Sequence, residues 1–231
     1  MKIDILSLFP SFFKTPFETS ILRRAIEENF IKISNIDIRE FSKDKKRRVD
    51  DRPFGGGPGM VMTPQPVIDA IRSVRRENTK VIFLSPQGKR FDSKKAEVLA
   101  KEEHIVFLSG HYEGVDQRII DLEVDEEISV GDYVLTNGCI ATLVVLDAMI
   151  RFLPNVIGNP DSAKFETFQD FLFDAPQYTR PVTFEGLEVP AILRSGNFKE
   201  IDKFRDEKRL QKTKKIREDL YQQFLKKKAI I

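Results

Sequence analysis

Three glycine-bearing segments carry the residue types best suited to a small-molecule site. They are LSPQGK at 84–89, LSGHYEG at 108–114 and ISVGDYVLTNG at 128–138, and each follows an apolar run. Small residues at strand ends leave main-chain N–H and C=O groups open to a ligand. We therefore expect the three segments to line one pocket. Charged side chains available around it are Glu113, Asp116, Arg118, Asp132, Arg151 and Glu166.

Motifs for other chemistries are missing from the sequence. There is no GxSxG or HExxH motif, and His104 and His111 are too few and too badly spaced for a zinc site. We interpret His104 as structural, His111 as lying at the pocket rim, and Cys139 as a small buried residue rather than a reactive thiol. No metal site is expected. A backbone-lined pocket with carboxylates nearby suits a zwitterionic or nucleoside ligand.

Alternating strands and helices must position these segments. Apolar runs predict strands at 2–9, 30–40, 80–85, 104–110 and 124–132, and helical periodicity predicts helices at 21–29, 66–78, 93–103, 115–123 and 139–153. This order is typical of an α/β domain with a mostly parallel sheet.

Residues 42–59 interrupt this order with a long loop rich in charge, glycine and proline. The composition predicts neither helix nor strand there. Disorder explains Lys43–Arg48 as well as function does, whereas the glycines of Arg52–Gly59 favour close contact with a ligand. No Gly-Lys-Ser/Thr follows, so a nucleotide hydrolase is the weakest functional interpretation.

The C-terminal part of the chain differs from the rest in charge. From Arg194 onward there are 13 Lys or Arg and 6 Asp or Glu, against 25 and 30 in the first 193 residues. Two basic helices are expected after Gly196, with Asn197 as the cap of the first. We predict a domain over 1–158, a linker at 159–170 and a helical domain over 171–231. A polyanionic partner and a solvated helix face explain the basic tail equally well.

Cysteine content and hydropathy indicate the compartment. The single cysteine, Cys139, rules out an internal disulfide, and no signal peptide or apolar span of 18 residues is present. We expect a soluble, cytoplasmic protein without a membrane partner.

Several longer segments resemble the bacterial tRNA (guanine-N1-)-methyltransferase family, TrmD. They run in order over nearly the whole chain, and some are long and rare. The segments are ILSLFP at 5–10, VDDRPFGGGPGM at 49–60, LSPQGK at 84–89, GHYEGVDQR at 110–118, DEEISVGDYVL at 125–135, RFLPNVIG at 151–158, PQYTRP at 176–181 and LEVPAILRSGN at 187–197.

The resemblance implies a fold and a cofactor. The fold would be an α/β domain with a SPOUT-type deep trefoil knot on its C-terminal side, followed by a small basic helical domain that binds tRNA. The chain would form a homodimer with the active site at the subunit interface. S-adenosyl-L-methionine would be the methyl donor, held by Leu84, Ser85, Pro86, Gly110, Val130, Gly131, Asp132, Tyr133, Val134, Leu135, Gly138 and the partner's Asp174.

The resemblance also implies a reaction, methyl transfer to N1 of guanosine 37 of tRNA. Glu166 would be the general base, Arg151 would steady charge on the guanine carbonyl oxygen, and Glu113 would face the methionine end of the cofactor. The region of Arg48, Asp50 and Arg52, with the C-terminal helices, would contact the tRNA, and no DNA partner is implied. Assistance by Mg²⁺ is possible, although no dedicated metal site is visible.

Three positions depart from the family's pattern. Glu166 stands where Asp is usual, so Asp161 and Asp170 remain alternative bases. Residues Asn137–Ala141 replace the usual Gly-Gly-Glu-Leu-Pro, and His111 replaces a common Arg. A knotted methyltransferase with another RNA target and a non-catalytic tRNA-binding protein are the alternative functions.

Overall fold

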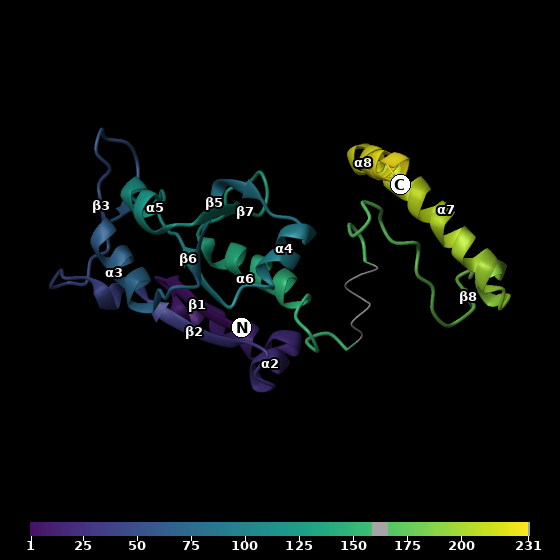
Figure 1. The fold of residues 1–231 in the computed structure, drawn as a ribbon, viewed down its shortest axis with the longest axis horizontal. Coiled ribbons are helices and arrows are strands. Elements are labelled where there is room, and N and C mark those ends of the chain that lie inside the picture. Colours follow the sequence, from purple (N-terminus) through teal and green to yellow (C-terminus); the bar gives the residue numbers. More distant parts are fainter. Residues whose placement is uncertain (159–165, 231) are drawn as a thin grey trace. The chain divides into compact units, whose positions relative to one another are not determined.

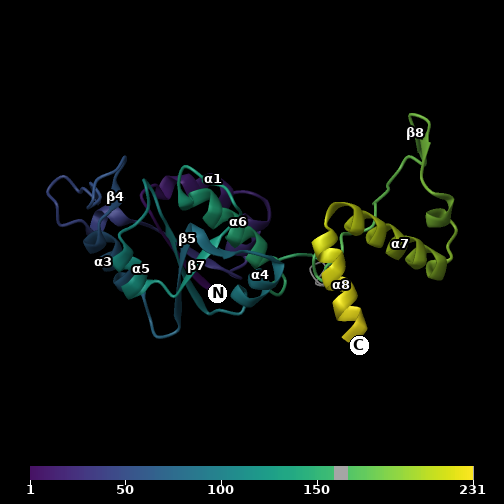
Figure 2. The same cartoon turned by 90° about the horizontal axis from the view of Figure 1, so that it is seen from above.

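A computed structural model describes residues 1–158 and 166–230. The chain forms two compact units, Met1–Pro160 and Asp161–Ile231, and each is described by itself. The first contains the sheet and its helices, and the second contains the C-terminal helices (Figures 1 and 2).

The first unit is built on a five-stranded sheet with the order β2-β1-β6-β5-β7. Every neighbouring pair in this sheet is parallel, which confirms the predicted sheet type. The central strands are buried along most of their length, as expected for a sheet that is covered on both faces. The strands are β1 (Lys2–Ser7), β2 (Lys32–Asp37), β5 (Thr79–Arg90), β6 (His104–Ser109) and β7 (Glu126–Ser129).

Helices cover both faces of this sheet. On one face, α2 (Ser20–Glu27), α4 (Ser93–Leu99) and α6 (Gly138–Ile150) contribute to one apolar cluster. On the other face, α3 (Pro64–Val74) and α5 (Gln117–Glu123) pack against a second cluster. Figure 1 shows α4 beside α6 and α3 beside α5. Shorter elements of this unit are the 3-10 helices at Pro10–Phe13 and Ile38–Phe41, α1 (Lys14–Phe17), β3 (Asp50–Asp51) and β4 (Val61–Met62).

A buried polar cluster joins the amino ends of the three central strands. The two ring nitrogens of His104 lie 2.8 Å from Asp4 Oδ2 and 2.7 Å from Thr79 Oγ1. His104 is aligned with Lys2 of β1 and with Thr79 of β5. Both ring nitrogens therefore have hydrogen-bond partners inside the sheet, which fits the structural role predicted for His104.

Two local expectations were wrong. Residues 84–89 do not end a strand: β5 continues to Arg90, with a shift in its register against β7 between Leu84 and Lys89. Pro86 lacks an N–H and cannot donate to the ladder, which fits an irregularity at this point. In the charged loop, Asp50–Asp51 forms a short strand that pairs antiparallel with β4.

The second unit contains two long helices, α7 (Phe198–Ile216) and α8 (Glu218–Ile230). The side chain of Asn197 accepts a hydrogen bond from Glu200 N, which confirms the predicted cap. Before α7 come a hairpin of β8 (Thr183–Phe184) and β9 (Leu187–Glu188) and a 3-10 helix at Ala191–Arg194. Within the described parts of the chain, no helix is long and apolar enough to cross a membrane.

Candidate functional site

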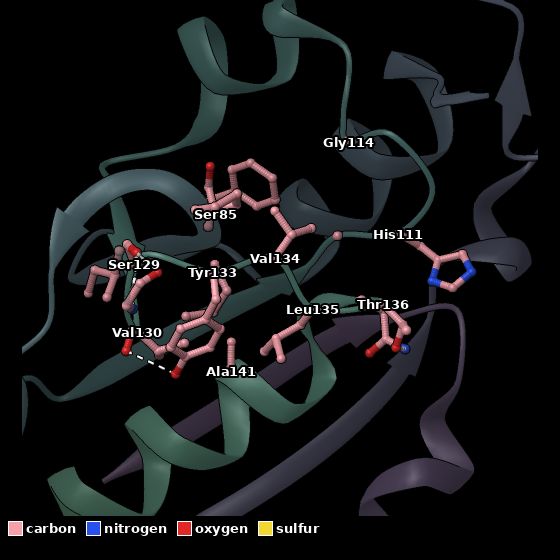
Figure 3. Close-up of a pocket in the computed structure, with 18 of the residues that line it drawn as sticks. Ser85, His111, Gly114, Ser129, Val130, Tyr133, Val134, Leu135, Thr136 and Ala141 are labelled. Carbon is pink, nitrogen blue, oxygen red and sulfur yellow. Dashed lines mark hydrogen bonds between the residues drawn. The ribbon is translucent and has the colours of Figure 1, made fainter. Parts of the chain in front are cut away.

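A pocket lies where β6 and β7 end, beside the register shift in β5, on the side of a parallel sheet where ligands usually bind. Residues from all three glycine-bearing segments line it, as the sequence predicts (Figure 3). Of the residues expected to hold the cofactor, ten line the pocket: Leu84, Ser85, Pro86, Gly110, Val130, Gly131, Tyr133, Val134, Leu135 and Gly138. Asp132 is exposed beside them and does not line it.

The pocket depends on a close approach between two chain segments. Gly138 N donates to Gly110 O at 2.8 Å, which joins the start of α6 to the turn after β6. A Cβ on Gly138 would lie 2.8 Å from Gly110 N and 2.9 Å from the Cα of Ser109. Both atoms belong to the backbone and cannot swing aside, so position 138 requires glycine.

Tyr133 closes one side of the pocket. Its hydroxyl donates to Val130 O at 3.2 Å, a contact drawn in Figure 3. A Cβ on Gly131 would lie 2.5 Å from the Tyr133 ring, and Gly131 has a φ of 151°. This backbone conformation is one that glycine adopts readily, and it lets the ring lie against the main chain.

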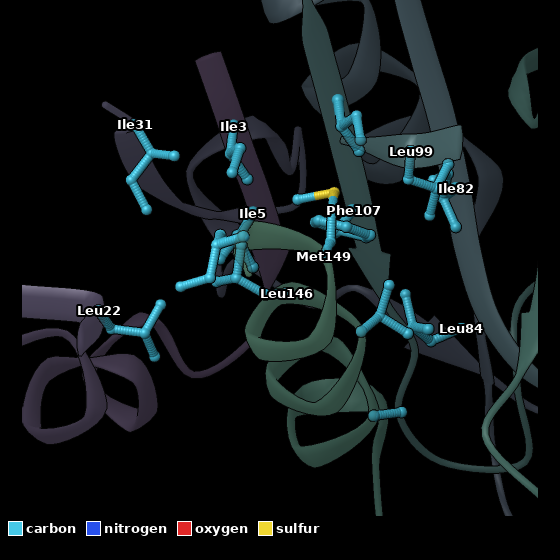
Figure 4. Close-up of a cluster of buried hydrophobic side chains, with 14 of the residues drawn as sticks. Ile3, Ile5, Leu22, Ile31, Ile82, Leu84, Leu99, Phe107, Leu146 and Met149 are labelled. Atoms are coloured by element: carbon cyan, nitrogen blue, oxygen red, sulfur yellow. The ribbon is translucent and has the colours of Figure 1, made fainter. Parts of the chain in front are cut away.

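Helix α6 forms the floor of the pocket and part of the core. Asn137 Oδ1 accepts from Cys139 N at 2.9 Å and caps the helix. Farther along, Leu146 and Met149 are fully buried in the apolar cluster with Ile5 and Phe107 (Figure 4). The residues expected to hold the cofactor did not include Thr136, Asn137 or Ala141, although Thr136 and Asn137 belong to the third glycine-bearing segment, which was expected to line the pocket. Ala141 could have been found, because it lies about one helical turn after Gly138.

Cys139 is buried at the start of α6, as expected. Burial raises the pKa of its thiol above the usual value, despite a weak contact with Ser7 Oγ at 4.0 Å. Because the thiolate is the reactive form, this environment disfavours a role as a nucleophile.

Glu113 lines the pocket and contacts the glycine-rich end of the loop at 42–59. Its N–H donates to Met60 O, and Met62 N donates to Gly114 O, both at 3.0 Å. A Cβ on Gly59 would lie 2.4 Å from the Glu113 side chain, so that side chain packs directly on the loop backbone. The loop therefore fixes where this carboxylate lies.

His111 lies at the pocket rim, as predicted. Its ring makes edge contacts with Phe9 and Tyr112, with centroids 5.1 and 4.6 Å away. Its Nδ1 is buried and has no hydrogen-bond partner within the described residues. Burial lowers the pKa of His111, and the charge of Arg39 adds to the effect. This position therefore favours a neutral ring.

The residues predicted to bind RNA occupy the charged loop in three different environments. Arg48 is exposed and pairs with Asp44, Nη2 to Oδ2 at 2.8 Å. Asp50 is half-buried in β3. The pKa of Tyr112 is raised, first by the burial of Tyr112 and second by the charge of Asp50. Arg52 is exposed. Asp50 is therefore close to the pocket rim, whereas the two arginines face solvent.

Arg151 does not lie at the same end of α6 as the pocket. It is the C-cap, one residue after the helix ends at Ile150, whereas Gly138 begins the helix. At 1.5 Å per residue the two positions are roughly 20 Å apart along the axis. Arg151 therefore lies far from the pocket floor of its own chain.

The remaining predicted site residues belong to the second unit. Glu166 and Asp174 begin and end a short loop, and Asp170 lies between them. Asp170 accepts two hydrogen bonds from Arg209 Nη2, both at 2.8 Å, so its carboxylate is already engaged. Asp161, the other alternative base, and most of the predicted linker, 159–165, lie outside the described residues.

Metal-ligating side chains do not cluster in the part of the chain that the structure describes. Residues 1–158 and 166–230 contain no group of three or more His, Cys, Asp and Glu side chains placed to hold an ion.

Comparisons with known proteins cover nearly the whole chain. The sequence model of the family described as tRNA (Guanine-1)-methyltransferase TrmD matches residues 1–223. A tRNA (guanine-N(1)-)-methyltransferase of Protochlamydia amoebophila is 56% identical over 220 residues, which are 95% of this chain and 99% of that protein.

Two relatives of the same name are longer than this chain. The Chlamydia pneumoniae protein is 51% identical over 230 residues, and a Chlamydia trachomatis protein is 50% identical over 224 residues. These matches cover 100% and 97% of this chain but 63% of each relative. Together with the family match, these identities show that the chain belongs to the tRNA (guanine-1)-methyltransferase family, TrmD.

Proposed function

We propose that this protein transfers a methyl group from S-adenosyl-L-methionine to N1 of guanosine 37 in tRNA. The observation that carries the proposal is the convergence of ten expected cofactor residues on one pocket beside the ends of β6 and β7 and the register shift in β5. Pocket and family membership together support this activity over another RNA target or a non-catalytic tRNA-binding protein.

The pocket fits the proposed cofactor. The three glycine-bearing segments line it together with apolar side chains such as Leu135 and Ala141, a setting that suits an adenine ring. Glu113 supplies a carboxylate for an ammonium group. When bound, the cofactor supplies an electrophilic methyl group. Any assistance by Mg²⁺ is a separate proposal, tested by titrating the ion in the assay.

The transfer needs alignment and removal of one proton. As the N1–CH₃ bond forms and the sulfur–CH₃ bond breaks, N1 loses its proton, and Glu166 accepts it. Arg151 balances the negative charge that develops on the guanine carbonyl oxygen. Arg48, Asp50, Arg52 and the basic helices contact the tRNA.

The position of Arg151 supports a homodimer whose active sites lie between subunits. One chain holds its Arg151 roughly 20 Å along α6 from its own pocket floor, by the rise of 1.5 Å per residue. The partner subunit's arginine fills the role instead, and Asp174 reaches the cofactor in the same way. Mixing an inactive Arg151→Ala dimer with an inactive Gly138→Val dimer should restore activity, and no restoration would contradict the shared site.

The path of the chain supports a trefoil knot in the first unit. After β7, at one edge of the sheet, the chain returns past β5 to the end of β6. There Gly138 N bonds to Gly110 O. A knot at this point requires such a return, and it would be a rare exception to the rule that chains do not thread loops.

Methyl transfer from labelled cofactor to unmodified tRNA tests the function and the base together. The wild-type protein should label tRNA with guanosine 37 and not the same tRNA with adenosine there. Glu166→Gln should lower kcat by about 10²- to 10⁴-fold, the usual contribution of a general base, with cofactor affinity unchanged. Glu77→Gln, an exposed glutamate of the first unit, is the matched control.

Each contrary result has a distinct meaning. Full activity of Glu166→Gln would reject this residue as the base. Labelling of neither tRNA by the wild type would reject the proposed reaction, and tRNA binding would then separate the two alternative functions.

A further inference from the structure

Residues 166–174 form a compact loop, here called the base loop because it begins with the proposed base. Phe168 N donates to Leu172 O at 3.0 Å, and Asp174 N donates to Thr167 Oγ1 at 3.1 Å. These bonds close the loop on itself. Both ends of the loop, which carry the proposed base and a proposed cofactor contact, are therefore fixed relative to each other.

The backbone of the base loop is held in an unfavourable conformation. Phe168 and Phe171 have φ values of 80° and 70°, a region that bulky side chains rarely adopt. Such conformations persist only where surrounding contacts determine them. Contacts from outside the loop are therefore needed to keep its shape.

Helix α7 supplies those contacts through Arg209 and Thr213. Arg209 Nη2 bonds both carboxylate oxygens of Asp170 at 2.8 Å, and Arg209 Nε donates to Phe173 O at 3.2 Å. The hydroxyl of Thr213, which is fully buried, accepts from Phe173 N and donates to Arg209 O, both at 2.8 Å. A guanidinium is suited to this role because its donors are fixed in one plane.

We propose that Arg209 is a positioning residue for methyl transfer, because it fastens the base loop to the helix predicted to bind tRNA. The inference rests on the proposed function. With the loop attached, α7 and Glu166 form one rigid body, so binding of tRNA along α7 also sets the position of the base. Catalysis is then coupled to recognition of the RNA outside the reacting base.

Arg209 is poorly placed for the simpler role of a phosphate contact. Only 21% of its side chain is exposed, and its donors already serve Asp170 and Phe173. Arg205, one turn earlier, is 53% exposed and pairs with Asp202 of the same helix at 3.5 Å. Among the residues that the structure describes, Arg205 therefore carries the same charge on the same helix with no bond to the base loop.

The test compares Arg209→Gln with Arg205→Gln in the full-length protein. Saturating tRNA and cofactor give kcat, and titration of each gives its KM. A misplacement of about 1 Å can cost 10²-fold in rate, so Arg209→Gln should lower kcat by about 10- to 100-fold with little change in the KM for tRNA. Arg209→Lys keeps the charge but loses the planar pair of donors, so its kcat should lie between those of the wild type and Arg209→Gln. Arg205→Gln should keep the wild-type kcat, and any loss of tRNA contact at this position should appear in the KM for tRNA alone.

A second variant covers the possibility that Arg209→Gln does not fold. Thr213→Val keeps the side-chain volume but removes the bond to Phe173 N, so it should also lower kcat rather than raise the KM for tRNA. Thermal unfolding of each variant shows whether it is folded at the assay temperature. Loss of folding by both Arg209→Gln and Thr213→Val, with full activity in Arg209→Lys, would overturn the proposal in favour of a structural role.

Other outcomes separate this inference from the proposed function. A higher KM for tRNA with unchanged kcat in Arg209→Gln would mean that Arg209 is only an RNA contact, and the inference would fail. Equal kcat in Arg209→Gln and Arg205→Gln would also overturn the inference. Failure of the wild type to methylate tRNA, or full activity of Glu166→Gln, would instead reject the function or the base.

Discussion

The pocket and the base loop are both expected to act on the same reaction, yet they are built in opposite ways. The pocket is formed by main-chain atoms and glycines, and its critical contact is the bond from Gly138 N to Gly110 O. The base loop is held by side chains, with Arg209 bonded to Asp170 and with Lys212 over the ring of Phe173.

The two regions are therefore positioned in different ways. A backbone-lined pocket is positioned by the path of the chain, so it tolerates changes in side chains but not the addition of one. A loop held by one ion pair and a few side-chain hydrogen bonds depends on a few side chains and responds to the loss of any of them. The first region should therefore be sensitive to volume and the second to charge.

The largest effect should come from adding a single methyl group to the pocket. In Gly138→Ala the new Cβ would meet backbone atoms at 2.8 and 2.9 Å, so the segments after β6 and before α6 must separate. Overpacking of this kind costs about 1–3 kcal/mol of stability. Calorimetric titration should show cofactor affinity reduced by more than about tenfold, which corresponds to 1.4 kcal/mol. Gly158→Ala is the control, because no atom of the described residues, its chain neighbours apart, lies within 4 Å of the added Cβ, and equal affinity in both variants would contradict the sensitivity to volume.

A smaller effect should come from removing charge on α7. Lys214 and Lys215 are exposed near the end of this helix. Their replacement by Gln should weaken tRNA binding several-fold and reduce the salt dependence of log K by about one unit for each phosphate that the protein no longer neutralises. Fluorescence titration at several salt concentrations measures both. Lys101→Gln, an exposed site in the first unit, should change neither, and an equal loss there would point to net charge alone.

The smallest effect should be a pH dependence at His111. Its folded-state pKa lies below the unfolded value near 6.5, so between the two values the unfolded chain binds more protons. The free energy of unfolding contributed by His111 is therefore fully present above pH 6.5 and decreases as the pH falls through the folded-state pKa. Denaturant unfolding at pH 5 to 8 should show a weaker decrease in His111→Gln. An unchanged profile would mean that the ring does not titrate with folding.

The sequence predicted the first region better than the second for a physical reason. Apolar runs and glycines mark buried strands and exposed backbone directly, so the parallel strands and most of the pocket residues could be found. The extension of β5 past Pro86 was missed because its register shift depends on pairing with β7. The bond between Arg209 and Asp170 joins residues 39 positions apart, on a helix with many cations, and local patterns do not select one pair among them.

The buried contacts of His104 also select among possible strand pairings during folding. His104 meets Asp4 and Thr79 only when β1, β6 and β5 are aligned as they are here. A slip of one residue would turn His104 to the other face and leave the Asp4 carboxylate buried without this partner, at a high desolvation cost. In a sheet of parallel strands joined by long crossovers, pairing is slow and wrong alignments compete. The cluster therefore favours the one alignment of β1, β6 and β5 on which the pocket at the opposite end of the sheet depends.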